Sequence, residues 1–141
     1  MIDRSRQGVV LSVLGRLLRI LCRSLPAYLE SARPWSRPDE ARGRTALARL
    51  IADQQALARR VAEAIIENHG TPDPGPFPLE FAALNDVSLD YLLGQILDRA
   101  RSDVEAVEHC VAELAIVPSA RRLAEEVLGN LQGHIDQIAQ L

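Results

Sequence analysis

Apolar residues recur at alternating spacings of three and four along four stretches of the chain, and this pattern constrains the fold more than any other feature. The stretches cover about 9–32, 45–68, 89–116 and 119–140. Such spacing places apolar side chains on one face of an α-helix, and no stretch alternates apolar and polar residues as a half-buried strand does. The sequence therefore predicts an all-α protein. Its 141 residues suffice for one domain with a buried core, over 1–141.

The connections between these helices are short, long and short. Residues 33–43 form the first link, about 69–87 form a long crossover with four prolines, and Pro118 marks the last break. Those prolines exclude regular helix and favour extended chain. An extended crossover reaches about 55 Å, whereas a helix of about 24 residues is about 36 Å long. The sequence therefore predicts an antiparallel four-helix bundle with one long crossover between its second and third helices.

Individual residues predict where the helices begin, bend and end. Pro26 should kink the first helix because proline removes a backbone donor. The expected N-caps of the next three helices, followed by the expected C-terminal stop of the second, are Thr45, Ser88, Ser119 and Gly70. In the crossover, Phe77 and Phe81 are expected to anchor the extended chain onto the helices.

Charge excludes several classes of function. The net charge of −3 gives no basis for nucleic-acid binding, although residues 1–44 are locally basic, and every basic residue of the chain is arginine. Arg16, Arg19 and Arg23 interrupt the apolar run of the first helix and lie on one side of it. A signal-peptide core or a membrane-spanning helix would not carry them. We therefore expect a cytoplasmic protein that binds neither nucleic acid nor membrane.

One polar residue interrupts the apolar face of each helix: Ser24, Gln54, Asp103 and His134. Counting residues from the short loops places the first two at about 12–15 Å from one end of the bundle and the last two at about 13–16 Å from the same end. Helical bundles build metal sites from inward-facing polar side chains at one common depth. These four residues are therefore the candidate site.

The segments around these positions resemble the ferritin-like superfamily, which includes ferritin, bacterioferritin and rubrerythrin relatives. The four matching segments are Ser24-Leu-Pro-Ala, Asp53-Gln54-Gln55-Ala56-Leu57-Ala58, Asp103-Val-Glu-Ala and Leu131-Gln-Gly-His134-Ile. The resemblance implies one carboxylate from each of the first and third helices and a Glu-x-x-His pair from each of the others. By that correspondence Asp103 and His134 keep ligand residues, whereas Ser24, Gln54, Leu57 and Leu131 replace them.

These replacements predict loss of the di-metal site. Bringing two divalent ions together requires several anionic oxygens, and Ser, Gln and Leu supply none. We expect no cofactor; the alternative is iron or another divalent metal in a residual site at Asp103 and His134, with neighbours such as Glu30 or Asp136. Without metal, Asp103 and His134 would instead form a buried hydrogen-bonded pair that holds the third and fourth helices in register, or they would be partly solvated residues at the edge. Gln54 would be a buried polar residue that sets helix register.

The first functional hypothesis is a non-catalytic ferritin-like bundle with a structural or protein-interaction role, as a homodimer or with another protein. The alternative is a divergent ferritin-like metal-binding protein or oxidoreductase. A third hypothesis is a helical regulator whose arginine-rich first helix binds an acidic partner. Cys22 and Cys110 match no metal or redox spacing and are expected to be reduced thiols.

Overall fold

The computed structural model describes residues 4–30, 32, 34–84 and 87–141, and the elements in this part of the chain are helical. In order they are α1 (Arg4–Cys22), α2 (Leu25–Leu29), the 3-10 helix η1 (Pro38–Glu40), α3 (Ala41–Glu67), the 3-10 helix η2 (Leu79–Leu84), α4 (Leu89–Glu113) and α5 (Pro118–Ala139). The only extended pairing among these residues is an isolated bridge between Trp35 and Ser88. The prediction of an all-α protein is confirmed.

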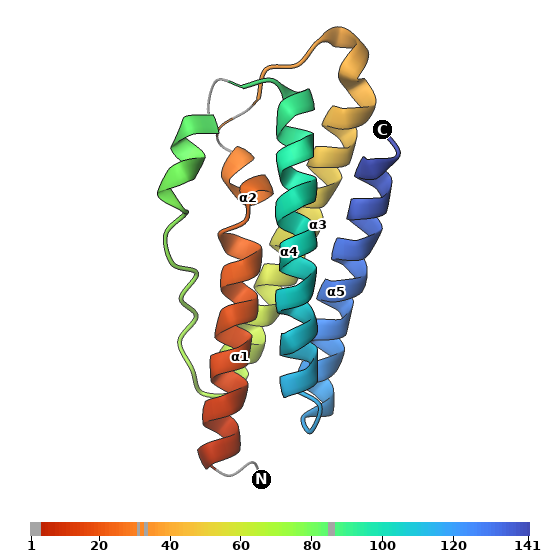
Figure 1. Cartoon of the computed structure of the whole chain (residues 1–141). Helices are drawn as coiled ribbons and strands as arrows, with labels where there is room; N and C mark the ends of the chain where they lie inside the picture. The colour runs from red at the N-terminus through yellow and green to blue at the C-terminus, as the bar shows by residue number, and fades with distance from the viewer. Residues whose placement is uncertain (1–3, 31, 33, 85–86) are drawn as a thin grey trace.

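The long helices lie lengthwise against one another (Figure 1). α1 packs against α3 and α4, and α5 packs against the same two helices. In Figure 1, α1 and α5 run upward, whereas α3 and α4 run downward. The connection from α3 to α4 climbs along the outer side of α1 and α2. In the described residues, no helix is long and apolar enough to cross a membrane.

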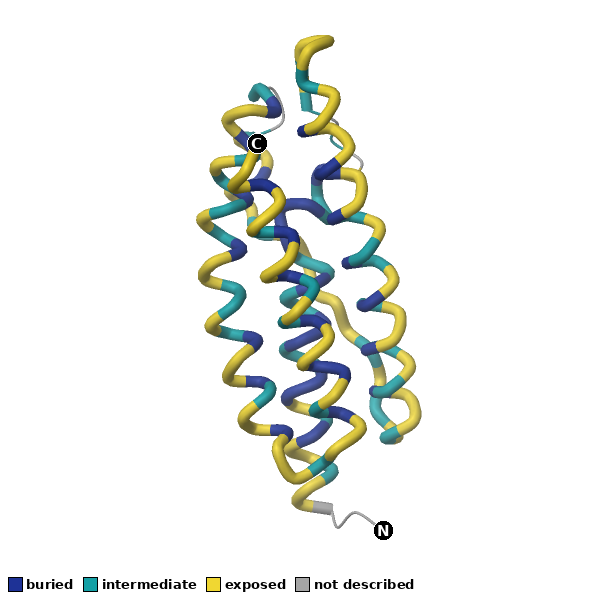
Figure 2. Tube along the Cα trace, turned by 90° about the vertical axis from the view of Figure 1, so that its right-hand side faces the viewer, coloured by how far each residue is buried: buried dark blue, intermediate teal, exposed yellow. Residues whose placement is uncertain are grey.

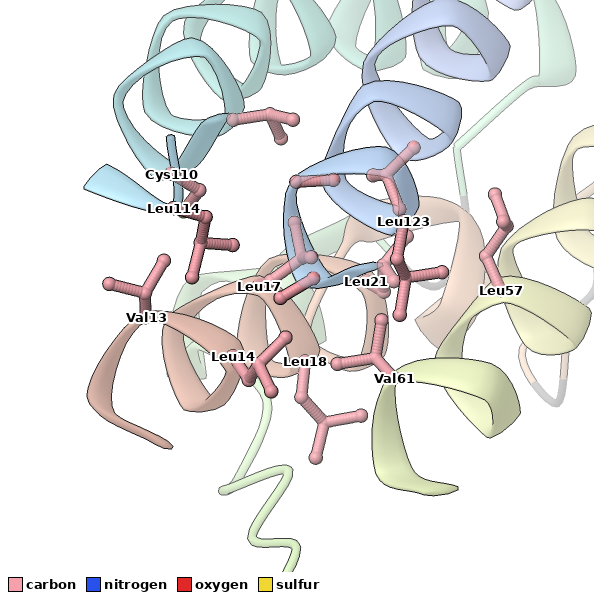
Figure 3. Close-up of a cluster of buried hydrophobic side chains, with 14 of the residues drawn as sticks. Val13, Leu14, Leu17, Leu18, Leu21, Leu57, Val61, Cys110, Leu114 and Leu123 are labelled. Carbon is pink, nitrogen blue, oxygen red and sulfur yellow. The ribbon is translucent and has the colours of Figure 1, made fainter. Parts of the chain in front are cut away.

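The buried apolar side chains form two clusters. The larger cluster joins α1, α3, α4 and α5, and Figure 3 shows its side chains converging from these helices, among them Leu14, Leu17, Val61 and Leu114. The smaller cluster joins α2 and η2 to the first turns of α3 and α4. Figure 2 shows buried positions recurring along each helix with exposed positions between them, as the predicted periodicity requires.

The first helix is shorter than the predicted 9–32 and ends at Cys22. Ser24 is extended (φ −71°, ψ 157°), and its Oγ accepts a hydrogen bond from the backbone N–H of Ala27 at 3.3 Å, which makes it the N-cap of α2. Pro26 lies in the first turn of α2, where the missing N–H has no partner to lose. The proline therefore divides the predicted helix in two rather than kinking it.

The second long helix starts earlier than Thr45, which is an exposed residue inside α3. The start lies at η1, where the backbone N–H of Arg37 donates to Glu40 Oε1 at 2.8 Å. Gly43 is helical and buried, and a Cβ there would lie 3.2 Å from Leu93 of α4. The glycine thus permits close packing at a position that the sequence had assigned to a linker.

α3 ends where Gly70 was expected to stop it. The N–H of Gly70 donates to the carbonyl of Ile65 at 2.9 Å, and His69 before it has a positive φ of 66°. A Cβ on Gly70 would lie 2.5 Å from Leu11 Cδ2, so the close approach of α1 requires glycine here.

Of the two N-caps predicted for the last two helices, one is confirmed and one is wrong. Ser88 caps α4, because its Oγ accepts from the N–H of Tyr91 at 3.3 Å. Ser119 does not cap α5; the helix begins at Pro118 after Val117, without a side-chain cap. Proline is favoured at the first helical position because its φ already suits the helix.

Aromatic contacts hold the α3–α4 connection against the helices. Phe81 in η2 is 2% exposed, and its ring lies 5.6 Å from that of Tyr28 at the end of α2. Phe77 is 40% exposed and meets Tyr28 edge-on at 5.4 Å. The anchoring predicted for these phenylalanines is confirmed.

Candidate functional site

Two of the four predicted site residues bond to each other. The Ser24 hydroxyl donates to Gln54 Oε1 at 2.8 Å, and both side chains are buried. The carbonyl of Leu21 lies 3.2 Å from the same hydroxyl as a second acceptor. This contact joins the α1–α2 break to the middle of α3, because Ser24 lies at the point where the chain leaves helical geometry.

His134 bonds to a residue that the sequence did not pair with it. Its Nε2 lies 2.6 Å from Asp53 Oδ2 on α3, and the amide of Asn130, one turn earlier on α5, donates to the same oxygen at 3.0 Å. An ionised carboxylate only accepts hydrogen bonds, so we infer that Nε2 carries the proton. The hydrogen bond predicted from Asp103 to His134 is replaced by one between α3 and α5.

These bonds favour the ionised form of Asp53. The hydrogen bond from Asn130 is the main cause that lowers the pKa of this carboxyl, and the hydrogen bond and positive charge that His134 can supply act in the same direction. Partial burial opposes them. The side chain of Asp53 is 48% exposed, whereas that of His134 is 8% exposed. Asp53 therefore lies between the buried histidine and the solvent.

Asp103 lies in a different environment on α4. It is half-buried, and burial raises the pKa of its carboxyl to about 6, although the nearby Arg99 guanidinium acts in the opposite direction. Asp103 lines an open cleft of about 680 Å³ between α1, α4 and the α3–α4 connection. Ser24 lines the same cleft. The Asp103 carboxyl is not part of the hydrogen bonds of Ser24 or His134.

Arginines from two helices line this cleft. Arg16 and Arg19 come from α1, Arg23 directly follows its last residue, and Arg99 comes from α4; the first three lie on one side of the chain, as expected. Its apolar lining includes Ile20, Leu25, Pro78, Phe81 and Ala106. The sequence indicated the first wall of this cleft, because three arginines share one side of the first helix. It did not indicate Arg99, because the position of Arg99 depends on how α4 packs against α1 and η2.

The described residues contain no group of three or more His, Cys, Asp or Glu side chains placed to hold a metal ion. Asp136, considered as an additional ligand, is exposed on α5, and Glu30 is exposed at the end of α2. Asp53 and Asn130 are the site residues that sequence reasoning missed. Asp53 directly precedes Gln54, and Asn130 lies four residues before His134, so the signal was their helical adjacency to predicted residues.

Cys22 and Cys110 are free thiols, as expected. Burial raises the pKa of both, which disfavours the thiolate form that acts as a nucleophile or a metal ligand. Neither thiol is therefore prepared for chemistry by its surroundings.

No model of a known protein family matches the chain, and no curated protein or solved structure is significantly similar to it.

Proposed function

We propose that the protein is a non-catalytic helical bundle of the ferritin-like kind, in which the metal-binding level has become a layer of hydrogen bonds that aligns the helices. Its role is then structural or that of an interaction module. The observation that carries the proposal is the bonding of Ser24 to Gln54 and of His134 to Asp53, because donors and acceptors that face a metal in such a bundle here face each other.

The order of the helices supports the ferritin-like part of the proposal. α1 and α3 pack together, α4 and α5 pack together, and the long connection between the two pairs runs beside α1. In ferritin-like bundles a crossover of this kind joins two antiparallel pairs. Ser24, Gln54 and His134 are all buried, as inward-facing residues of a former site would be.

The chemistry of the layer supports the non-catalytic part. Ser24 and Gln54 are neutral, so they offset little of the cost of removing water from a divalent ion. Asp53 is the one carboxylate bonded into the layer, and His134 and Asn130 already occupy one of its oxygens. Asp103 faces the cleft beside Arg99. A bridged pair of ions able to activate oxygen needs more anionic ligands than this.

Metal analysis tests the proposal directly. Protein purified without chelator should contain no stoichiometric iron, zinc or manganese, and titration with Fe(II) under anaerobic conditions should leave the melting temperature unchanged. Two tightly bound metals per chain would show that the protein is instead a divergent metal-binding member of the superfamily.

A variant with restored ligands tests the ferritin-like arrangement separately. Ser24→Glu, Gln54→Glu, Leu57→His and Leu131→Glu together rebuild the residue types that the resemblance implies, beside Asp103 and His134. We expect this variant to gain Fe(II) or Co(II) binding and to be stabilised by it, because metal binding to the folded state offsets the buried charge. A control for added negative charge carries carboxylates beside two of these positions, Gln55→Glu and Gln132→Glu. Equal metal binding by both variants would contradict the arrangement.

The interaction role is proposed first for a second copy of the chain. Val9 of α1 and Ile116 after α4 are 51% and 64% exposed and line one small hollow at the same end of the helices. Light scattering coupled to gel filtration measures the oligomeric state. If Val9→Asp with Ile116→Asp does not shift a dimer toward monomer, the dimer uses another surface; a wild-type chain that is monomeric at high concentration rules the homodimer out.

A further inference from the structure

Four arginines line the cleft between α1, α4 and the α3–α4 connection, and only two of them form ion pairs with residues that the structure describes. Arg16 pairs with Glu113, and Arg99 Nη1 lies 2.9 Å from Glu80 Oε1. Arg19 and Arg23, in contrast, form no ion pair with any residue that the structure describes. Two half-buried arginines one helical turn apart therefore line the cleft without an ion pair, although Asp98 and Asp103 line the same cleft.

Hydrogen bonding at these arginines is also incomplete. The Nε–H groups of Arg23 and Arg99 are buried and have no acceptor in the protein. Buried donors without acceptors are rare in native proteins and point to a strained or functional position. Among the described residues three side-chain atoms have this status, and two of them belong to this cleft. Because the Nε atoms of Arg23 and Arg99 are buried, a ligand in the cleft would have to bind the terminal guanidinium nitrogens.

The surrounding chain holds the arginines in place. Gly75 of the connection has φ +70°, and a Cβ there would lie 3.3 Å from Arg23 Cδ and 3.8 Å from Arg19 Cδ, so the backbone packs on both arginine stems. On the opposite wall the Arg99 guanidinium lies 4.8 Å from the centre of the Phe81 ring. Side chains already fixed by packing lose less entropy when they bind a ligand.

Apolar side chains lie beside this charge. Ile20, Leu25 and Phe81 line the cleft with the arginines, and the volume of about 680 Å³ is that of a small-molecule site. A ligand that suits both parts has an anionic head and a compact apolar body. Guanidinium groups match the geometry of phosphate oxygens, and two free arginines match a dianion better than a single carboxylate.

We propose that this cleft binds an organic phosphate monoester, with the phosphate between Arg19 and Arg23 and the organic group against Phe81 and Ile20. Arg19 and Arg23 take no part in the hydrogen bonds between α3 and α5. The proposal for this cleft can therefore be tested independently of the proposed loss of a metal site. Asp103 lines the same cleft, and its negative charge opposes the phosphate. Replacing Asp103 by a neutral isostere is therefore expected to tighten binding.

Isothermal titration calorimetry with phenyl phosphate at pH 7.5 and low salt tests the site, with phenol and inorganic phosphate as comparison ligands. We expect phenyl phosphate to bind more tightly than inorganic phosphate and phenol not to bind. Arg19→Gln with Arg23→Gln should weaken phenyl phosphate by about tenfold or more, because two charge-assisted contacts are lost. The control Arg59→Gln with Arg122→Gln removes the same charge from exposed positions on α3 and α5 and should leave binding unchanged.

The Asp103→Asn variant supplies a test of opposite sign, which a folding defect cannot imitate. It should bind phenyl phosphate about two- to tenfold more tightly than the wild type. Equal weakening in the cleft and control arginine variants would mean non-specific charge attraction and would overturn the proposal, as would unchanged or weaker binding by Asp103→Asn. No measurable binding to the wild type at millimolar phenyl phosphate would overturn it too.

A phosphate monoester also occurs as a lipid headgroup, so the source is tested with vesicles. Sedimentation with vesicles containing phosphatidic acid, compared with phosphatidylcholine alone, measures binding to the headgroup. Loss of phosphatidic-acid binding in the Arg19→Gln, Arg23→Gln variant, with soluble phenyl phosphate bound weakly by the wild type, would assign the cleft to a lipid. Binding of phenyl phosphate without vesicle binding would assign it to a free metabolite.

Discussion

Polar groups have opposite surroundings at the α3–α5 interface and in the α1–α4 cleft. Between α3 and α5, Asp53 receives hydrogen bonds from Asn130 and His134, and its pKa lies below the usual value. In the cleft, Asp103 is left with a pKa raised to about 6, and Arg23 has a buried N–H without an acceptor.

This difference separates a stabilising role from a binding role. Hydrogen bonds that satisfy one another hold helices in register, and removing one partner costs stability. Charges that lack partners inside the protein cost stability and are kept where a ligand can use them. We therefore propose that the first region aligns the helices and that the second binds a ligand.

The largest effect is expected from Gln54, which is 7% exposed and bonded to Ser24. Gln54→Ala should lower the free energy of unfolding by about 2–4 kcal/mol, because it leaves a cavity and removes a buried hydrogen bond. Gln54→Leu fills the space, and the Ser24 hydroxyl can then donate to the carbonyl of Leu21, so the loss should be about 1 kcal/mol or less. Urea unfolding measures both; equal losses would show that the hydrogen bond to Ser24, which both variants lose, contributes the stability and that filling the space does not restore it.

Asp103 should change stability with the opposite sign. Its folded pKa of about 6 lies above the usual value of 3.8 for an aspartate, so between these values the folded state holds a proton that the unfolded state has released. Stability therefore falls as pH rises from about 4 to about 6. Asp103→Asn should therefore raise the free energy of unfolding at pH 7.5 by about 1–3 kcal/mol. Below about pH 4 the gain should vanish. A gain that is the same at pH 4 and pH 7.5 would mean that ionisation is not its cause.

Asp53 should show the reverse dependence and a smaller size. A folded pKa below the unfolded value contributes stability that is present at neutral pH and is lost as the pH falls through the folded pKa. Because the side chain is 48% exposed, Asp53→Asn should cost only about 0–1 kcal/mol at pH 7. The wild type and the variant should converge at acid pH. A larger loss at pH 3.5 than at pH 7 would remove the contrast with Asp103.

Much of the fold could be predicted from the sequence because helical periodicity is a local signal. Leu50, Val61, Ile96 and Val127, which belong to the apolar positions within the predicted helices, are all buried. The helix starts were less predictable: Thr45 and Ser119 are good caps in isolation, but η1 and Pro118 start those helices earlier. The choice depends on how the preceding chain packs, which a local pattern does not contain.

The candidate site divides in the same way. The sequence by itself determined that one polar residue interrupts each apolar face at a similar depth and that three arginines share one side of the first helix, because both follow from residue spacing. Only the tertiary structure decided that His134 turns to Asp53 rather than to Asp103 and that Arg99 faces the arginines of α1. The rotation of each helix about its axis selects such neighbours, and that rotation results from the packing of all the helices together.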